Sequence, residues 1–370
     1  MPLRPLLHLQ HPRSIVRQFT PNWFGVVMGT GICAQLLATL PGGHGPGALL
    51  WLSALAGFVI FSLLYATRWV LYPQEASRVF GHATVSMFFG TVPMALATLL
   101  NGYWQFTAGQ SPELIYLLWW LDVAMAVGCG VGVPFLMFTR QQHSIEQMSA
   151  VWLLPVVACE VAGASGAALV PHLSDPAQQL QVMLTSYVLW ALSVPVALAI
   201  LTILILRMAL HKLPHESLAA TSWLALGPLG TGALLLLALG VNAPEVFAAQ
   251  GLAALGGWAD GLGVFGGLML WGFGAWWLLL AMLITGCYLR KGLPFNLGWW
   301  AFVFPLGVFS LATGRLADAL GWPAMHLIAL GLTLATLAIW AMVISLTVRG
   351  AWRGDLFFSP CLAAQIQSRA

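Results

Sequence analysis

Ten long apolar stretches, joined by short polar connections, constrain this chain more than any other feature. Each stretch has about 20 residues or more, enough for a helix to cross a hydrocarbon core of about 30 Å. Charged residues make up 7% of the chain, against roughly 25% in soluble domains. We therefore predict an all-α polytopic membrane protein, with residues 1–370 as a single membrane domain. The predicted spans are 21–40, 48–71, 83–102, 113–138, 149–170, 180–207, 220–241, 261–288, 297–319 and 323–348.

The positions of the basic residues predict the orientation of these spans. Cytoplasmic connections are enriched in Lys and Arg. With the N-terminus in the cytoplasm, 13 of the 14 basic residues fall on the cytoplasmic side, and Arg315 alone falls outside. We expect a multi-pass protein of the plasma (inner) membrane with both termini cytoplasmic. The 13 residues are Arg4, Arg13, Arg17, Arg68, Arg78, Arg140, Arg207, Lys212, Arg290, Lys291, Arg349, Arg353 and Arg369.

The odd-numbered spans share a weak repeat of an aromatic residue, a proline and small residues. Proline inside a helix frees a backbone carbonyl and bends the axis, and small residues let membrane helices approach closely. The first span has no central proline but is rich in glycine. The pattern predicts an inner ring of odd helices, kinked at prolines, with the even helices outside. The pairs are Phe88 and Pro93, Trp152 and Pro155, Trp223 and Pro228, and Trp300 and Pro305.

The ninth span places an aromatic residue and a basic residue on one helix face. Phe304 directly precedes Pro305, and Arg315 follows Phe304 by eleven residues. On an ideal helix the two side chains project within about 20° of each other, about 16 Å apart along the axis. If Phe304 faces a pore, Arg315 faces its outer mouth and attracts anions. The alternatives for Arg315 are an anchor to lipid headgroups or an ion pair with Asp318.

Glu160, in the middle of the fifth span, is the main candidate for proton coupling. Ionisable residues inside a membrane are functional candidates by default. The alternative is a structural carboxyl, hydrogen-bonded between helices, and Asp122 in the fourth span fits that alternative better.

The rest of the sequence indicates neither an enzyme nor a cofactor protein. Its cysteines and histidines lack metal-ligand spacing, so we expect no metal site and no cofactor. We find no catalytic motif in a supporting context and expect no nucleic-acid partner. Hydroxyl groups and backbone amides of the odd spans, including Thr231 and Ser310, are hydrogen-bond donors that suit an anion.

Five motifs resemble the tellurite-resistance/dicarboxylate transporter (TDT) family. That family includes malate permeases, sulfite efflux pumps, tellurite-resistance proteins and slow anion channels. The resemblance runs in order along nearly all ten spans. The motifs are PNWFGVVMGTGI (21–32), FFGTVPMALATLL (88–100), WLLPVVACEVAGASG (152–166), TSWLALGPLGTG (221–232) and LPFNLGWWAFVFPLGVFSLAT (293–313).

The resemblance implies five helical hairpins around a central pore, with odd-numbered helices inside, and commonly a homotrimer. It also implies a phenylalanine on the ninth helix that plugs the pore. By its position before the proline this residue is Phe304, with Phe302 as the fallback.

The predicted function is transport of a small anion, of the C4-dicarboxylate, sulfite or tellurite type, across the bilayer. One alternative is a proton-coupled dicarboxylate carrier that uses Glu160. Alternatives of other classes are a non-transporting membrane subunit and an intramembrane enzyme.

Overall fold

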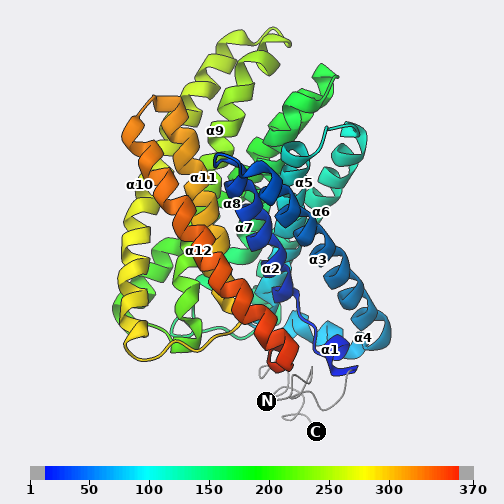
Figure 1. Ribbon diagram of the computed structural model, residues 1–370, viewed down its shortest axis with the longest axis vertical. Coiled ribbons are helices and arrows are strands. Elements are labelled where there is room, and N and C mark those ends of the chain that lie inside the picture. Colours follow the sequence, from blue (N-terminus) through cyan, green and yellow to red (C-terminus); the bar gives the residue numbers. More distant parts are fainter. Residues whose placement is uncertain (1–12, 358–370) are drawn as a thin grey trace.

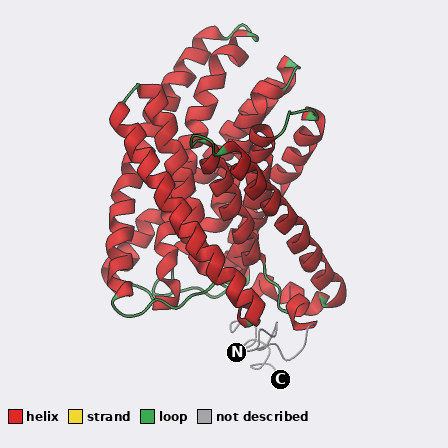
Figure 2. Cartoon of the chain, viewed as in Figure 1, coloured by secondary structure: helices red, strands yellow, loops and turns green. Residues whose placement is uncertain are grey.

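The computed structural model describes residues 13–357, and every regular element in them is a helix (Figure 2). Nine helices in this range are long and apolar enough to cross a membrane. The all-α polytopic membrane fold is therefore confirmed. The predicted first span is shorter, a 3₁₀ turn at Pro21–Trp23 followed by the 15-residue helix α2 (Phe24–Ala38). The count of ten spans stays a prediction.

The long helices follow one another through short connections. Two of them, α8 and α10, exceed their predicted spans, with 36 and 37 residues. After α2 come α3 (His44–Leu71), α5 (Thr91–Phe106), α6 (Pro112–Thr139), α7 (Leu153–Leu169), α8 (Pro176–His211), α9 (Leu226–Ala248), α10 (Ala253–Leu289), α11 (Val303–Leu320) and α12 (Pro323–Arg353).

The first and last helices of the described chain meet at one end of the molecule. The short helix α1 (Arg13–Arg17) lies there, near the last turn of α12 (Figure 1). We call this the terminal end and the opposite one the far end. A second short helix, α4 (Pro73–Ser77), follows α3 directly. Arg4 and Arg369, counted above, lie outside the described residues.

Burial divides the long helices into two layers. In the most apolar stretches of α5, α7, α9 and α11, each taken with the 3₁₀ segment before it, 72–94% of residues are buried. In α3, α6, α8, α10 and α12 the share is 17–33%, and large apolar side chains such as Phe138 and Met269 are exposed, as lipid contact requires. Most of α2 is also buried. We call α2, α5, α7, α9 and α11 the inner helices and the others the outer helices.

A 3₁₀ segment directly precedes each inner helix, on the side of the molecule's terminal end. These segments are η1 (Pro21–Trp23), η3 (Val85–Gly90), η4 (Ala150–Trp152), η6 (Glu216–Ala225) and η7 (Leu297–Phe302). In four inner helices a proline is the third residue of the α-helical part that follows: Pro93, Pro155, Pro228 and Pro305. First-turn N–H groups have no intrahelical acceptor, so proline is tolerated there. The four prolines thus lie where 3₁₀ geometry changes to α geometry.

Glycines allow the inner helices to pack closely. A Cβ added at Gly29 would lie 2.5 Å from the ring of Trp300, and one at Gly307 would lie 2.8 Å from Ile32. One at Gly230 would lie 2.8 Å from the backbone nitrogen of Phe309. These glycines belong to α2, α11 and α9, so the small residues of the sequence motifs are sites of helix–helix contact.

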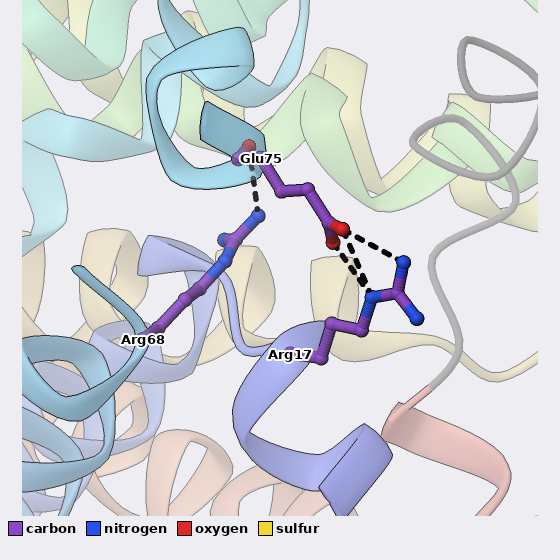
Figure 3. Close-up of polar contacts among 3 residues, drawn as sticks. All are labelled: Arg17, Arg68 and Glu75. Carbon is purple, nitrogen blue, oxygen red and sulfur yellow. Dashed lines mark hydrogen bonds and ion pairs between the residues drawn. The ribbon is translucent and has the colours of Figure 1, made fainter. Parts of the chain in front are cut away.

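Polar contacts tie the chain together at the terminal end (Figure 3). Arg17 donates to Glu75 from Nη2 at 2.7 Å and from Nε at 2.8 Å. Arg68, whose side chain is buried, donates to the carbonyl of Phe19 and, at 3.4 Å, to that of Glu75. Two short segments, α1 and α4, are thereby held against the end of α3.

Glycine at position 230 should be required for the packing of α9 on α11. Replacing it with alanine places a methyl group against backbone atoms, which cannot rotate away. We expect Gly230→Ala to lower the free energy of unfolding by about 1–3 kcal/mol. Thermal unfolding of the detergent-solubilised protein would measure this loss. Gly128→Ala is the matched control, because no atom lies within 4 Å of a Cβ there. Equal unfolding temperatures for the two variants would contradict the proposed contact.

The Arg17–Glu75 pair should make stability depend on pH in the acidic range. The hydrogen bond from Arg17 holds the pKa of Glu75 below its ordinary value of 4.5. A carboxyl with a depressed pKa stabilises the fold above its unfolded-state pKa, and this stabilisation is lost as pH falls through the folded-state pKa. We expect Glu75→Gln to remove that part of the acid-induced loss, at most about 1 kcal/mol because Arg17 is half exposed.

Unfolding temperatures from neutral pH downward would test this expectation, with Arg17→Gln and the double variant completing a thermodynamic cycle. Wild type and Glu75→Gln losing stability in parallel would argue against the pair.

Candidate functional site

All five inner helices contribute side chains to one cavity near the start of their α-helical parts. The room that this cavity leaves for a solute is about 10 Å³, close to that of a single water molecule. Every lining residue is apolar, so the cavity is a hydrophobic constriction between helices. The lining residues are Met28 from α2, Met94 from α5, Leu153, Leu154 and Val157 from α7, Leu224 from η6, Gly227 from α9, and Phe304 and Pro305 from α11.

The structure places Phe304 and its fallback, Phe302, differently. Phe304 lines the cavity. Phe302 packs edge-to-face on Trp223, with ring centroids 5.4 Å apart, and on Trp299 at 5.8 Å. Of the two phenylalanines, only Phe304 lines the cavity.

Arg315 lies in the last two turns of α11, toward the far end, and its side chain is exposed. Asp318, its candidate ion-pair partner, instead has Oδ1 3.8 Å from Nε2 of His326. Within residues 13–357 Arg315 has no ion pair. Its guanidinium is thus available to solutes or to lipid headgroups.

Glu160 lies where α7 packs on α8, wholly buried and outside the cavity lining. Within the described chain, neither carboxylate oxygen meets hydrogen-bond geometry. The hydroxyl of Ser193 on α8 lies close enough to interact with this carboxyl group. Asp122 on α6 is equally buried and also lacks a partner in residues 13–357. Charged carboxylates in such places are costly, so both positions need an explanation.

The side chains that could bind a metal ion are dispersed in the described part of the chain. Within the described residues, no three His, Cys, Asp or Glu side chains are grouped so as to hold a metal ion. Cys33 and Cys159 are buried in the apolar interior.

Sequence reasoning did not identify most of the residues that share the cavity with Phe304. Leu154, Gly227 and Phe304 each directly precede a proline, and Met94 directly follows one. Proximity to the repeated proline was therefore the signal for these positions. Met28, on the helix without a central proline, had no such signal.

Comparison with known proteins agrees with the family that the sequence motifs resemble. The family model described as "SLAC1: Voltage-dependent anion channel" matches residues 18–348. A sulfite efflux pump, SSU1, of Arthroderma benhamiae is 35% identical over 358 residues, covering 92% of this chain and 93% of the pump.

More distant relatives cover a similar share of this chain. A transporter of Methanocaldococcus jannaschii is 29% identical and covers 93% of this chain and 98% of its own length. The malic acid transport protein of Schizosaccharomyces pombe is 24% identical and covers 93% of this chain and 81% of its own length. The resemblance to the TDT family is confirmed by these matches, and the chain belongs to the SLAC1 family of voltage-dependent anion channels.

Proposed function

We propose that this protein conducts a small anion across the plasma (inner) membrane along a path between the inner helices, closed at Phe304. The observation that carries the proposal is the cavity to which all five inner helices contribute and which Phe304 lines. Membership of an anion-channel family supports an anion as the transported species. It also favours a transporter over an intramembrane enzyme or a non-transporting subunit.

The cavity lining supplies a physical reason for closure. An anion that enters a space lined by methionine, leucine and phenylalanine loses hydration and gains no hydrogen bond in return, at a cost of several kcal/mol. Hydrophobic constrictions close channels in this way. Conduction would require the Phe304 ring to move aside, so that water can enter with the ion. Arg315 at the far end would raise the local anion concentration.

The described residues near the path favour a small anion over a C4-dicarboxylate. A dicarboxylate calls for two cationic groups, whereas Arg315 is the only basic residue of α11. The sulfite efflux pump is also more similar to this chain than the malic acid transport protein is. We propose an oxyanion of the sulfite or tellurite type as the substrate.

Orientation and assembly follow from separate arguments. Arg68, Arg207, Arg290 and Arg353 lie at the ends of α3, α8, α10 and α12, all at the terminal end. By the positive-inside rule this end would face the cytoplasm. Assembly as a homotrimer is proposed on the resemblance to the TDT family.

Phe304→Ala should open the path. Removing the ring from the constriction lowers the barrier, so we expect passive anion flux into proteoliposomes to rise about tenfold or more. Flux would be measured for chloride, sulfite and malate, which also ranks the substrates. Phe302→Ala is the matched control, since that ring packs on Trp223 and Trp299 and should leave flux unchanged.

Unchanged flux in a folded Phe304→Ala protein would remove Phe304 as the gate. A selective rise in Phe302→Ala would transfer the role to that residue.

A proton-coupled dicarboxylate carrier is the second candidate function, and the burial of Glu160 without a partner favours it. Our proposal expects Glu160→Gln to transport anions within about twofold of wild type, because Glu160 faces Ser193 and does not line the cavity. Uptake driven by an imposed pH gradient is the measurement. Gradient-driven malate uptake that is lost in Glu160→Gln and kept in Ser193→Ala would establish the carrier instead.

A further inference from the structure

Two amide side chains lie beyond the cavity, on the same helix faces as the methionines that line it. Gln35 follows Met28 by seven residues on α2, and Asn101 follows Met94 by seven residues on α5. Seven residues turn an ideal helix to within about 20° of the starting direction and advance it about 10 Å. Both amides therefore project toward the line that continues the cavity to the far end.

Contacts between α2 and α5 agree with this placement. Nε2 of Gln35 lies 3.4 Å from the carbonyl oxygen of Thr98, at the long limit for a hydrogen bond. A Cβ added at Gly31 would lie 2.6 Å from the side chain of Thr98, so the two helices pack closely at this level. Gln105, one turn beyond Asn101, reaches the carbonyl of Gln35 with its Nε2 at 3.5 Å. Amide groups thus gather between α2 and α5.

Asn101 has hydrogen-bonding capacity that the described chain does not use. Its Oδ1 is buried and has no partner within residues 13–357, although the residue as a whole is only half-buried. Buried polar atoms normally have partners, so an unpaired one requires an explanation. A ligand that offers a hydrogen-bond donor would supply the missing partner.

A hydroxyl and a guanidinium follow cavity residues on two other inner helices, α9 and α11, at spacings that place them toward the far end. Thr231 follows the cavity residue Gly227 by four residues on α9, within about 40° of the same direction. Its Oγ1 is buried and has no partner among the described residues. Arg315 follows Phe304 by eleven residues on α11, within about 20° of its direction. The four side chains come from four of the five inner helices.

We infer that Gln35, Asn101, Thr231 and Arg315 form an anion-binding subsite between the constriction and the far end. The inference rests on the proposed function and adds the class of substrate: a small oxyanion that carries one negative charge and one proton. Such an anion accepts hydrogen bonds from amide N–H groups, a hydroxyl and a guanidinium. Its own O–H can donate to the unpaired carbonyl oxygen of Asn101.

Other anions fit this set of groups less well. A halide, or an oxyanion without a proton, would leave the Asn101 oxygen unpaired and would face it with negative charge. A dicarboxylate would bring a second charge with no second cation. Neutral amides also bind an anion weakly enough to release it, which conduction requires.

The test measures selectivity in the Phe304→Ala background, where the constriction no longer limits flux. Proteoliposome flux would be compared for sulfite under mildly acidic conditions, where it carries one proton, and for nitrate and chloride, which carry none. Asn101→Leu preserves shape and removes the amide. We expect the sulfite-to-nitrate flux ratio to fall about tenfold, the usual effect of losing a hydrogen bond to a charged group. Gln35→Met and Thr231→Val should lower the flux of sulfite and of nitrate alike, because an amide N–H and a hydroxyl donate to either anion.

Asn242→Leu is the matched control for the amide. Asn242 also lies near the far end of an inner helix, but its Nδ2 already donates to the carbonyls of Ala167 and Ala238, at 2.9 and 3.0 Å. The flux ratio should therefore stay at the parent value in this variant. Stabilisation of the purified protein against heat by sulfite gives a second readout that does not depend on flux, and it should weaken in Asn101→Leu alone of the two.

The possible failures are distinguishable. Flux through Phe304→Ala with an unchanged sulfite-to-nitrate ratio in Asn101→Leu, and with unchanged sulfite flux in Gln35→Met and Thr231→Val, would overturn the subsite and leave the proposed function standing. Absence of anion flux through a folded Phe304→Ala protein would overturn the proposed function and the subsite with it. If Asn101→Leu does not fold, the sulfite flux and the heat stabilisation by sulfite in Thr231→Val decide the matter, and values equal to those of the parent protein would overturn the subsite.

Discussion

Close contact between glycine-bearing inner helices is the constraint on which the rest of this structure depends. In a membrane, helix association gains little from the hydrophobic effect and relies on packing at small residues. Because Gly230 has no side chain, the backbone of α11 can pack directly against α9. In the same way, Gly29 lets the ring of Trp300 pack against α2. Only at such separations can single side chains from all five inner helices meet in one cavity.

The central path combines an apolar closure with polar groups on its far side. The cavity offers an anion no hydrogen bond, whereas amide and hydroxyl groups on the same helix faces remain incompletely paired. In the function that we propose, closure depends on the Phe304 ring and selectivity on these other side chains. Glu160, one turn beyond Val157 on α7, faces the neighbouring outer helix instead. For an anion transporter this placement keeps a carboxyl out of the cavity lining.

Much of this arrangement could be predicted because it depends on local sequence. Four prolines identified helices that prove to be buried: Pro93, Pro155, Pro228 and Pro305. This was possible because the effect of a proline or a glycine on a helix is local, within about one turn. The geometry of the prolines differed from a kink in mid-helix, because each stands in a first turn after a 3₁₀ segment. The position of Met28 in the same cavity as Phe304 could not be predicted. These residues lie on helices almost 280 residues apart in the chain, a relation that no local period encodes.

Hydrophobic length determined, from the sequence alone, an all-α membrane protein, and five sequence motifs indicated its family by resemblance. These are properties of single helices in a bilayer, and each can be evaluated one segment at a time. The tertiary structure decided which phenylalanine lines the cavity, toward which helix Glu160 points, and which amides lie beyond Phe304. Those outcomes depend on the rotation of each helix about its own axis. That rotation is set by contacts between helices, where the fit of Gly31 against Thr98 or of Gly307 against Ile32 selects one orientation among many.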